Sequence, residues 1–132
     1  MARKKSRQKL IDKPLTPTEL EMMNVVWRVG PCSVHQVVEA LRPDRELAYT
    51  SVSTIIRILE QKGYVVSLKE GRGHLYEAAV AKETYQAKSL ERLVTHVFDG
   101  ASTLLVQRLI DSDQLSVEEL ARIKNTMRRK DS

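Results

Sequence analysis

The sequence predicts a mainly α-helical chain that carries one small β-hairpin. Three observations support this fold class. Three short segments before residue 62 show helical hydrophobic spacing with separate start and stop signals, a glycine-rich turn at residues 69–73 separates two strand-like segments, and three more helical segments follow residue 81. With 132 residues, the chain fits one domain or two very small ones.

The first predicted helix begins at a capping box. Thr16 stands at the N-cap, Pro17 at the first helical position and Glu19 at the third, a pattern in which two side chains satisfy free backbone N–H groups. Gly30 followed by Pro31 predicts the end of this helix, because glycine favours the helix C-terminus and proline cannot continue it.

The second predicted helix begins at another capping box, made by Ser33 and Gln36. Its apolar stripe consists of Val34, Val37, Val38 and Leu41, and residues 42–44 have the composition of a turn. Three short helices joined by tight turns are typical of a helix-turn-helix, in which the third helix reads DNA.

The third predicted helix begins near Ala48 or Tyr49 and ends at Gly63. One face is an apolar stripe of Val52, Ile55, Ile56 and Leu59. The opposite face, called the acid-free face below, carries Thr50, Ser53, Thr54, Arg57 and Gln61. A solvated helix face usually mixes acids and bases, and this alternative stays open for the helix alone, but a face without acids suits the major groove of DNA.

A predicted β-hairpin follows the third helix directly. Residues 64–68 are apolar and β-branched, and residues 74–78 alternate as a returning strand. A hairpin in this place is a wing, so the sequence predicts a winged helix-turn-helix. Arg72 lies between two glycines at the tip, where it is either a solvent-exposed turn residue or a contact to a phosphate or the minor groove.

Residues 14–80 resemble the winged-helix domain of the penicillinase repressors, the BlaI/MecI/CopY family of bacterial regulators. The matching stretches are residues 15–20, Val26 with Trp27, residues 49–54, residues 59–63 and residues 71–76. Residues 97–100 and 115–120 look like landmarks of the family's C-terminal dimerisation domain. The resemblance implies a homodimeric repressor of a palindromic operator, released by proteolysis or by a metal. The copper-responsive branch carries paired cysteines near its C-terminus, which this sequence lacks.

The expected DNA contacts lie on the third helix and the wing. Hydroxyl groups can hydrogen-bond base edges, and threonine methyl groups can contact thymine methyl groups. The candidates for base contact are Thr50, Ser53, Thr54 and Arg57, and by resemblance Thr50 and Ser53 face the bases most directly. The candidates for phosphate or wing contact are Ser51, Lys69, Arg72 and His74, with Ser51 near the unpaired amides of the helix N-terminus.

The excess positive charge is concentrated at the N-terminus. The formal net charge is +5, and residues 1–13 account for all of it with six basic residues and one acidic residue. We expect this basic arm to be flexible. Two interpretations stay open: the arm tracks DNA phosphates and strengthens non-specific binding, or it is a disordered tail that improves solubility.

Residues 81–132 are expected to form a helical dimerisation domain. Helices are predicted at residues 82–98, at residues 102–110 and from Ser116, which forms a capping box with Glu119. So few residues have little core of their own. The N-terminal domain could cover their apolar positions, but a two-fold dimer also explains how two half-sites are spanned. The candidate interface residues are Leu90, Leu93, Val94, Val97, Phe98, Leu104, Leu105, Leu109, Leu120, Ile123 and Met127.

The sequence shows no constellation for catalysis and no cofactor motif, so no enzyme, cofactor or metal site is predicted. Cys32 and His35 could supply two metal ligands, fewer than zinc requires, and a buried thiol is the preferred interpretation. Aromatic residues make up only 5% of the chain, which argues against RNA binding by base stacking. A single cysteine, no apolar run of about 18 residues and no secretory signal favour a cytoplasmic protein.

The sequence therefore predicts a homodimeric winged-helix repressor that binds a palindromic DNA operator and responds to an inducing signal. A regulatory protease is a further partner, and residues 97–102 lie where a break between helices could be cut. The alternatives are a winged-helix module that docks proteins, which would show weak salt dependence with random DNA, and a ligand-sensing winged-helix regulator of another type.

Overall fold

The computed structural model describes residues 14–131, so the predicted basic arm at residues 1–13 lies outside the described part of the chain. The chain divides into two compact units, the first ending at Lys88 and the second beginning at Ser89. Each unit is described by itself. The assignment of DNA binding to residues 14–80 and of dimerisation to residues 81–132 stays a prediction.

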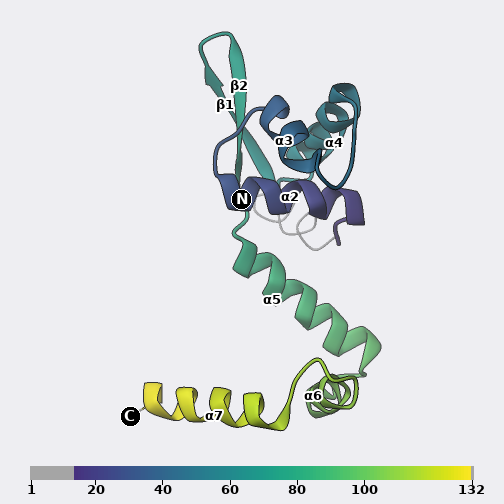
Figure 1. Cartoon of the computed structure of the whole chain (residues 1–132), viewed down its shortest axis with the longest axis vertical. Coiled ribbons are helices and arrows are strands. Elements are labelled where there is room, and N and C mark those ends of the chain that lie inside the picture. The colour runs from purple at the N-terminus through teal and green to yellow at the C-terminus, as the bar shows by residue number, and fades with distance from the viewer. Residues whose placement is uncertain (1–13, 132) are drawn as a thin grey trace, which may run out of the picture. The chain divides into compact units, whose positions relative to one another are not determined.

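The first unit begins with three helices (Figure 1): α2 (Pro17–Val29), α3 (Val34–Leu41) and α4 (Tyr49–Gln61). Both predicted capping boxes are confirmed. The Thr16 hydroxyl accepts from the Glu19 N–H at 3.2 Å while the Glu19 carboxylate accepts from the Thr16 N–H at 2.8 Å. Ser33 and Gln36 form the same pair at the start of α3. Local side-chain chemistry thus starts two of the helices where the sequence predicts.

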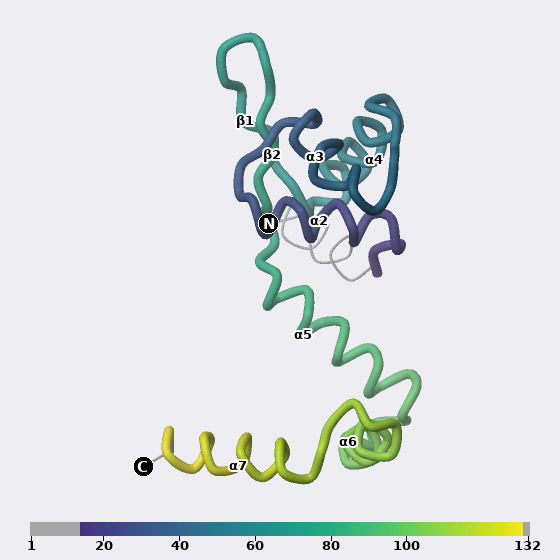
Figure 2. The backbone as a smooth tube through the Cα atoms, in the orientation of Figure 1, coloured from purple at the N-terminus to yellow at the C-terminus, as the bar shows by residue number. Residues whose placement is uncertain are grey.

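A two-stranded antiparallel hairpin follows, with β1 (Val65–Glu70) paired to β2 (Gly73–Ala78), and it projects beyond the helices of this unit (Figure 2). The turn is tighter than the predicted residues 69–73, because Lys69 pairs with His74 and Glu70 with Gly73 in the strand register. Gly71 and Arg72 alone form the turn. Gly71 has a φ of 60°, a left-handed conformation that a two-residue hairpin turn requires and that glycine adopts without strain.

The hydrophobic core of the first unit is formed by α2, α3, α4 and the base of the hairpin. Its fully buried side chains are Met22, Met23, Val26, Cys32, Val37, Val52, Ile56, Leu59, Tyr64 and Val65. Tyr85, from the first turn of helix α5 (Lys82–Arg92), also packs there, and its hydroxyl accepts a hydrogen bond from the Leu15 N–H at 3.1 Å. The Trp27 indole donates to the Val80 carbonyl at 2.8 Å. The winged-helix unit therefore has a complete core within one chain.

The second unit contains the end of α5, a π-helical turn η1 (Leu93–Val97), α6 (Ser102–Asp111) and α7 (Val117–Asp131). The predicted helix over residues 82–98 is confirmed as far as Val97, but its last turn is π-helical, which the sequence did not indicate. The Phe98 N–H donates to the Leu93 carbonyl at 3.2 Å, five residues back, which widens the helix by one residue before it ends. Asp99 and Gly100, with φ values of 51° and 82°, then break the helix as predicted.

The start of α7 is confirmed as a third capping box, in which Ser116 and Glu119 exchange hydrogen bonds of 2.9 and 3.0 Å. Within the described part of the second unit, no residue is buried. Its large apolar side chains are instead exposed, among them Leu90, Leu93, Val97, Val117, Ile123 and Met127. Across residues 14–131, no helix is both long and apolar enough to cross a membrane.

Candidate nucleic-acid interface

Helix α4 separates its two faces as the sequence predicts. Val52, Ile56 and Leu59 are buried in the core. On the acid-free face, Thr50, Thr54, Arg57 and Gln61 are exposed, while Ser53 is half-buried at its edge. The structure therefore brings the four predicted base-contacting residues onto one accessible side of one helix. Their contact with bases is not tested by this arrangement and stays a prediction.

The N-terminus of α4 differs from those of α2 and α3. Ala48 is its N-cap, and among the described residues no side chain caps this helix. Free amides at a helix N-terminus, together with the helix dipole, favour an anion such as a phosphate. Ser51, the predicted phosphate contact, is exposed in this first turn. Beside it, the rings of Tyr49 and His35 lie 4.6 Å apart between centroids and join α4 to α3.

Thr54 offers a different chemical group from the one its sequence position alone suggests. Its hydroxyl donates a hydrogen bond to the Thr50 carbonyl at 2.9 Å, one helical turn earlier. The hydroxyl proton is therefore occupied, and Thr54 presents its methyl group and an acceptor oxygen. Of the two contacts that a threonine can make with DNA, this geometry favours the methyl contact with thymine.

The sequence pattern missed Ile58. Its side chain is 37% exposed, one turn after Thr54 on the same side of α4. An apolar residue on an otherwise polar face carries no separate sequence signal, because the neighbouring Ile55, Ile56 and Leu59 belong to the buried stripe. Tyr49 and His35 were likewise not expected to touch, since their contact depends on how the turn at residues 42–44 folds back.

The predicted basic contacts of α4 and the wing are available to a partner. Lys69, Arg72 and His74 are exposed on the hairpin, and Arg57 is exposed on α4. Within residues 14–131, none of these basic side chains forms an ion pair, whereas Arg42 is paired with Glu39 at 3.0 Å and Arg45 with Glu21 at 2.6 Å. Unpaired lysine and arginine side chains beside a helix face without acids form a surface suited to the phosphates of DNA.

A partly buried ion pair lies at the C-terminal end of α4. Lys62, the residue that follows α4, donates to both carboxylate oxygens of Glu19 at 3.0 and 2.9 Å. Burial raises the pKa of the Glu19 carboxyl, but the hydrogen bonds from Lys62 and from the Thr16 N–H, with the charge of Lys62, outweigh burial and hold the pKa below its ordinary value. Sequence reasoning found the capping role of Glu19 but not this pair, whose members are 43 positions apart.

Cys32 belongs to the core and not to a reactive site. It is buried, and burial raises the pKa of its thiol. Its backbone forms a β-bridge with Tyr76, with N–O distances of 3.0 and 2.8 Å, which ties the base of the wing to the connection before α3. In the described residues, His, Cys, Asp and Glu side chains form no group of three or more that could hold a metal ion.

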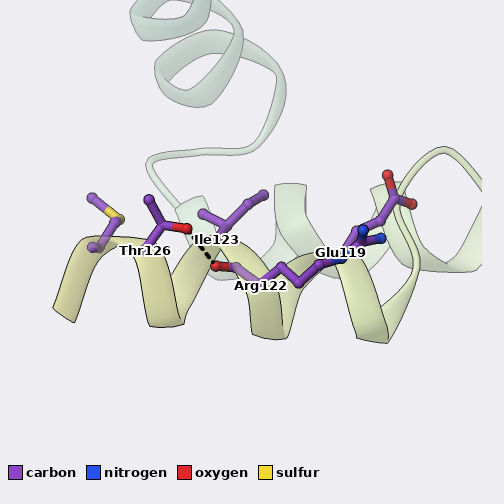
Figure 3. A pocket seen from close by; sticks show the side chains of 5 residues that line it. Glu119, Arg122, Ile123 and Thr126 are labelled. Atoms are coloured by element: carbon purple, nitrogen blue, oxygen red, sulfur yellow. Dashed lines mark hydrogen bonds between the residues drawn. The ribbon is translucent and has the colours of Figure 1, made fainter. Parts of the chain in front are cut away.

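The second unit has a shallow hollow of about 410 Å³ along α7. It is lined by Glu119, Arg122, Ile123, Thr126 and Met127, and Figure 3 shows labelled members of this set along one side of the helix. The Thr126 hydroxyl donates to the Arg122 carbonyl at 2.9 Å, so it is already used within the helix. The hollow therefore follows an exposed, partly apolar helix side and does not enclose a ligand-sized cavity.

The helices α2 to α4 with the hairpin after them have the fold of a winged-helix regulator. Comparison with known proteins identifies the family: the chain belongs to the penicillinase repressors, whose family pattern matches residues 15–129. It is therefore a DNA-binding transcriptional repressor, in a family of repressors and not of enzymes.

Two relatives and one solved structure illustrate the similarity. The chain is 22% identical over 116 residues to the methicillin resistance regulatory protein MecI of Mammaliicoccus sciuri, covering 88% of this chain and 94% of MecI. It is 41% identical over 85 residues to the transcriptional regulator BlaI of Mycobacterium tuberculosis (strain H37Rv), covering 64% and 62% of the two chains. A crystal structure of oxidised MarR from E. coli shares the fold, with a TM-score of 0.50, 14% identity and coverage of 98% and 88%.

Proposed function

We propose that this repressor acts in the cytoplasm as a homodimer on a pseudo-palindromic operator, with α4 of each protomer in the major groove of one half-site. The observation that carries this proposal is the burial pattern of the second unit. Among its described residues none is buried, although it is rich in Leu, Ile and Val. Apolar surface of this extent on a small helical unit marks an interaction site. A second copy of the same unit would cover it and would also present two copies of α4.

The interface in this proposal uses the predicted dimerisation residues of all the C-terminal helices. Leu90, Leu93 and Val97 are exposed at the end of α5 and in η1, and Ile123 and Met127 are exposed on α7. The remaining candidates are only half-buried: Val94, Phe98, Leu104, Leu105, Leu109 and Leu120. Burying these side chains against a partner would gain about 25 cal/mol for each Å² of apolar surface removed from water.

DNA contact in this proposal divides into base contacts and phosphate contacts. Thr50 and Ser53 would hydrogen-bond base edges, Thr54 would present its methyl group to thymine, and Arg57 would contact a guanine or a phosphate. Ser51 and the free amides of α4 would bind one phosphate. In the wing, Lys69, Arg72 and His74 would follow the backbone of the same half-site. Occupying a promoter in this way would exclude RNA polymerase.

Release of the operator would follow an inducing signal, and in this proposal a regulatory protease would act between η1 and α6. Residues 99–101 are exposed between η1 and α6, and the backbone at Asp99 and Gly100 leaves the helical conformation. Exposed, irregular connections are the preferred sites of proteolysis. A cut here would separate Leu90, Leu93 and Val97 from the α6 and α7 residues of the interface and would weaken the dimer.

Footprinting on the DNA upstream of the repressor's own gene, with excess competitor DNA, tests the proposal. We expect protection of two related half-sites whose centres lie about one helical turn apart, or a multiple of it. Protection of a single half-site would contradict the dimeric arrangement. Affinity that is weak, insensitive to salt and equal for all sequences would instead favour the alternative of a protein-docking module.

A further inference from the structure

The buried stripe of α4 determines which face of the helix meets the core. Val52, Ile56 and Leu59 form a single apolar stripe along the helix. Hydrophobic contacts are non-directional, so such a stripe resists exposure of the buried face more than it resists tilting or sliding of the helix. Precise base contact requires both of these movements to be restrained, because hydrogen bonds tolerate only small changes in distance and angle.

The pair of Glu19 and Lys62 supplies a directional contact at the C-terminal end of α4. Lys62 is the C-cap residue of the helix, and its ammonium group bonds both oxygens of the Glu19 carboxylate at 2.9 and 3.0 Å. The carboxylate is itself held in place, because one of its oxygens accepts the Thr16 N–H at 2.8 Å. Glu19 is only 5% exposed. The last turn of α4 is thus fastened to a rigid point on the first turn of α2.

Stability alone does not account for an ion pair in which the Glu19 side chain is buried and the Lys62 side chain is only 23% exposed. Removing two charges from water costs free energy that their attraction repays only in part, and a neutral pair of similar size often leaves a protein equally stable. What the charged pair adds over an apolar contact is a distance constraint, because its hydrogen bonds keep their strength only while the N–O distance stays below about 3.2 Å.

A small change at this clamp has a large effect at the opposite end of the helix. At about 1.5 Å per residue, Thr50 lies about 18 Å along the helix axis from Lys62. A tilt of about 10° around the clamped end would move Thr50 by about 3 Å, as far as a whole hydrogen bond is long. The direction of α4 therefore decides whether the acid-free face meets the bases.

We propose that Glu19 and Lys62 are positioning residues, which fix the direction of α4 and so set the preference of this repressor for its operator over other DNA. The proposal rests on the proposed function, in which α4 contacts bases. Neither residue needs to touch DNA. Their pair selects the one helix direction in which Thr50 and Ser53 reach the base edges, while phosphate contacts, which depend less on direction, remain in any case.

The test is the charge-neutral double variant Glu19→Gln with Lys62→Met in the full chain. Affinity is measured for the footprinted operator and for a random duplex of equal length. We expect operator affinity to fall about ten-fold or more, which is the loss of one or two base contacts. Random-DNA affinity should change less than about two-fold, because the net charge and the phosphate contacts are unchanged. The melting temperature should stay within about 5 °C of the native value.

The chain offers a matched control in a second ion pair on α2. Arg45 and Glu21 lie 2.6 Å apart with their side chains 41% and 36% exposed. The double variant Glu21→Gln with Arg45→Met makes the same change of charges at an exposed pair, and it should alter neither affinity. The conservative variant Lys62→Arg keeps a cation that can bond both oxygens of Glu19, and it should retain most of the operator preference.

An operator preference in the Glu19→Gln with Lys62→Met variant equal to that of the native protein, within about two-fold, would overturn the proposal. If this variant is too unstable, Glu19→Gln alone replaces it, because its amide oxygen can still accept the Thr16 N–H and the Lys62 side chain, 23% exposed, can stay charged in water. An unchanged ratio of operator to random-DNA affinity would overturn the proposal equally. A native protein without any operator preference would contradict the proposed function itself, which separates the two failures.

Discussion

The two units of this repressor contain similar apolar side chains and place them differently. Every buried residue of the described chain lies between Leu15 and Tyr85, in the winged-helix unit. In the second unit, Val97 and Met127 are 65% and 63% exposed. The first unit completes its core within one chain, whereas the second does not. The difference teaches that similar apolar residues form a core in the winged-helix unit and leave the described residues of the second unit without one, which is the observation behind the proposed dimer.

The largest expected effect comes from a charge on the exposed apolar side of α7, which tests whether a partner covers the second unit. Ile123→Glu should weaken self-association by about 4 kcal/mol, because dimerisation would bury an unpaired carboxylate. Sedimentation equilibrium measures this loss. Asn125→Glu is the matched control, since it adds the same charge about 200° around the helix. Equal dimerisation of both variants would show that this side of α7 is not covered by a partner.

A smaller effect is expected from truncation in the complete core. Leu59→Ala should lower the free energy of unfolding of the first unit by about 3 kcal/mol, because Leu59 is fully buried and leaves a cavity. Urea unfolding followed by the fluorescence of Trp27, the only tryptophan, reports on this unit. Leu90→Ala should change the same transition far less, since Leu90 is 52% exposed in the single chain. An equal loss of unfolding free energy in the two variants would contradict the difference in burial between the two units.

Substitutions on the acid-free face of α4 test whether the winged-helix unit contacts bases. Thr50→Ala and Ser53→Ala should each weaken operator binding by about 2 kcal/mol and relax the preference at one base pair, while leaving random-DNA binding nearly unchanged. Gln61→Ala, at the other end of the face, is a matched control for helix exposure. Titrations against operator variants with single base-pair changes measure the effect. An equal loss of affinity for operator and random DNA would show that these residues do not contact bases.

The smallest expected effect is on the pH dependence of stability, and it is compared for two capping glutamates, one in each unit. Burial raises the pKa of Glu19, but Lys62 and Thr16 lower it further, and the backbone and side chain of Ser116 lower the pKa of Glu119 despite a small opposing effect of desolvation. Both carboxylates therefore stabilise the fold above the ordinary pKa of 4.5, and this contribution is lost as pH falls through each lowered pKa.

Carbon-detected NMR titration of the carboxyl groups should therefore find both pKa values below 4.5. In acid unfolding followed by Trp27 fluorescence, Glu19→Gln should flatten the pH dependence below pH 4.5, because the unfolded state no longer takes up that proton preferentially. Glu119→Gln, in the other unit, should leave this transition unchanged. A pKa of Glu19 at or above its ordinary value would contradict the structure of the ion pair.

The features that the sequence predicts well are those encoded by neighbouring residues. The capping boxes at Thr16, Ser33 and Ser116 involve partners three positions away, so their chemistry is visible in the sequence and each is confirmed. The winged-helix fold and the exposure of the acid-free face follow from spacing in the same way. The assignment of individual DNA contacts and of the dimer interface remains a prediction.

The features that sequence reasoning missed depend on distant contacts or on small shifts of backbone geometry. The pair of Glu19 and Lys62 joins two helices, and nothing near either residue signals the other. The π-helical turn of η1 adds one residue to a helical repeat without changing its apolar composition, so residues 82–98 look like one regular helix. The wing turn was expected to be longer because glycines at 71 and 73 hide the pairing of Glu70 with Gly73.

The mass of the complex between the full chain and an operator duplex tests the central claim most directly. Sedimentation or native mass spectrometry would be performed on the intact operator and on a duplex in which one half-site is scrambled. The account predicts two chains on the intact operator, bound together, and a large loss of affinity when one half-site is scrambled. One chain on each duplex, bound with equal affinity to both, would contradict the dimeric repressor.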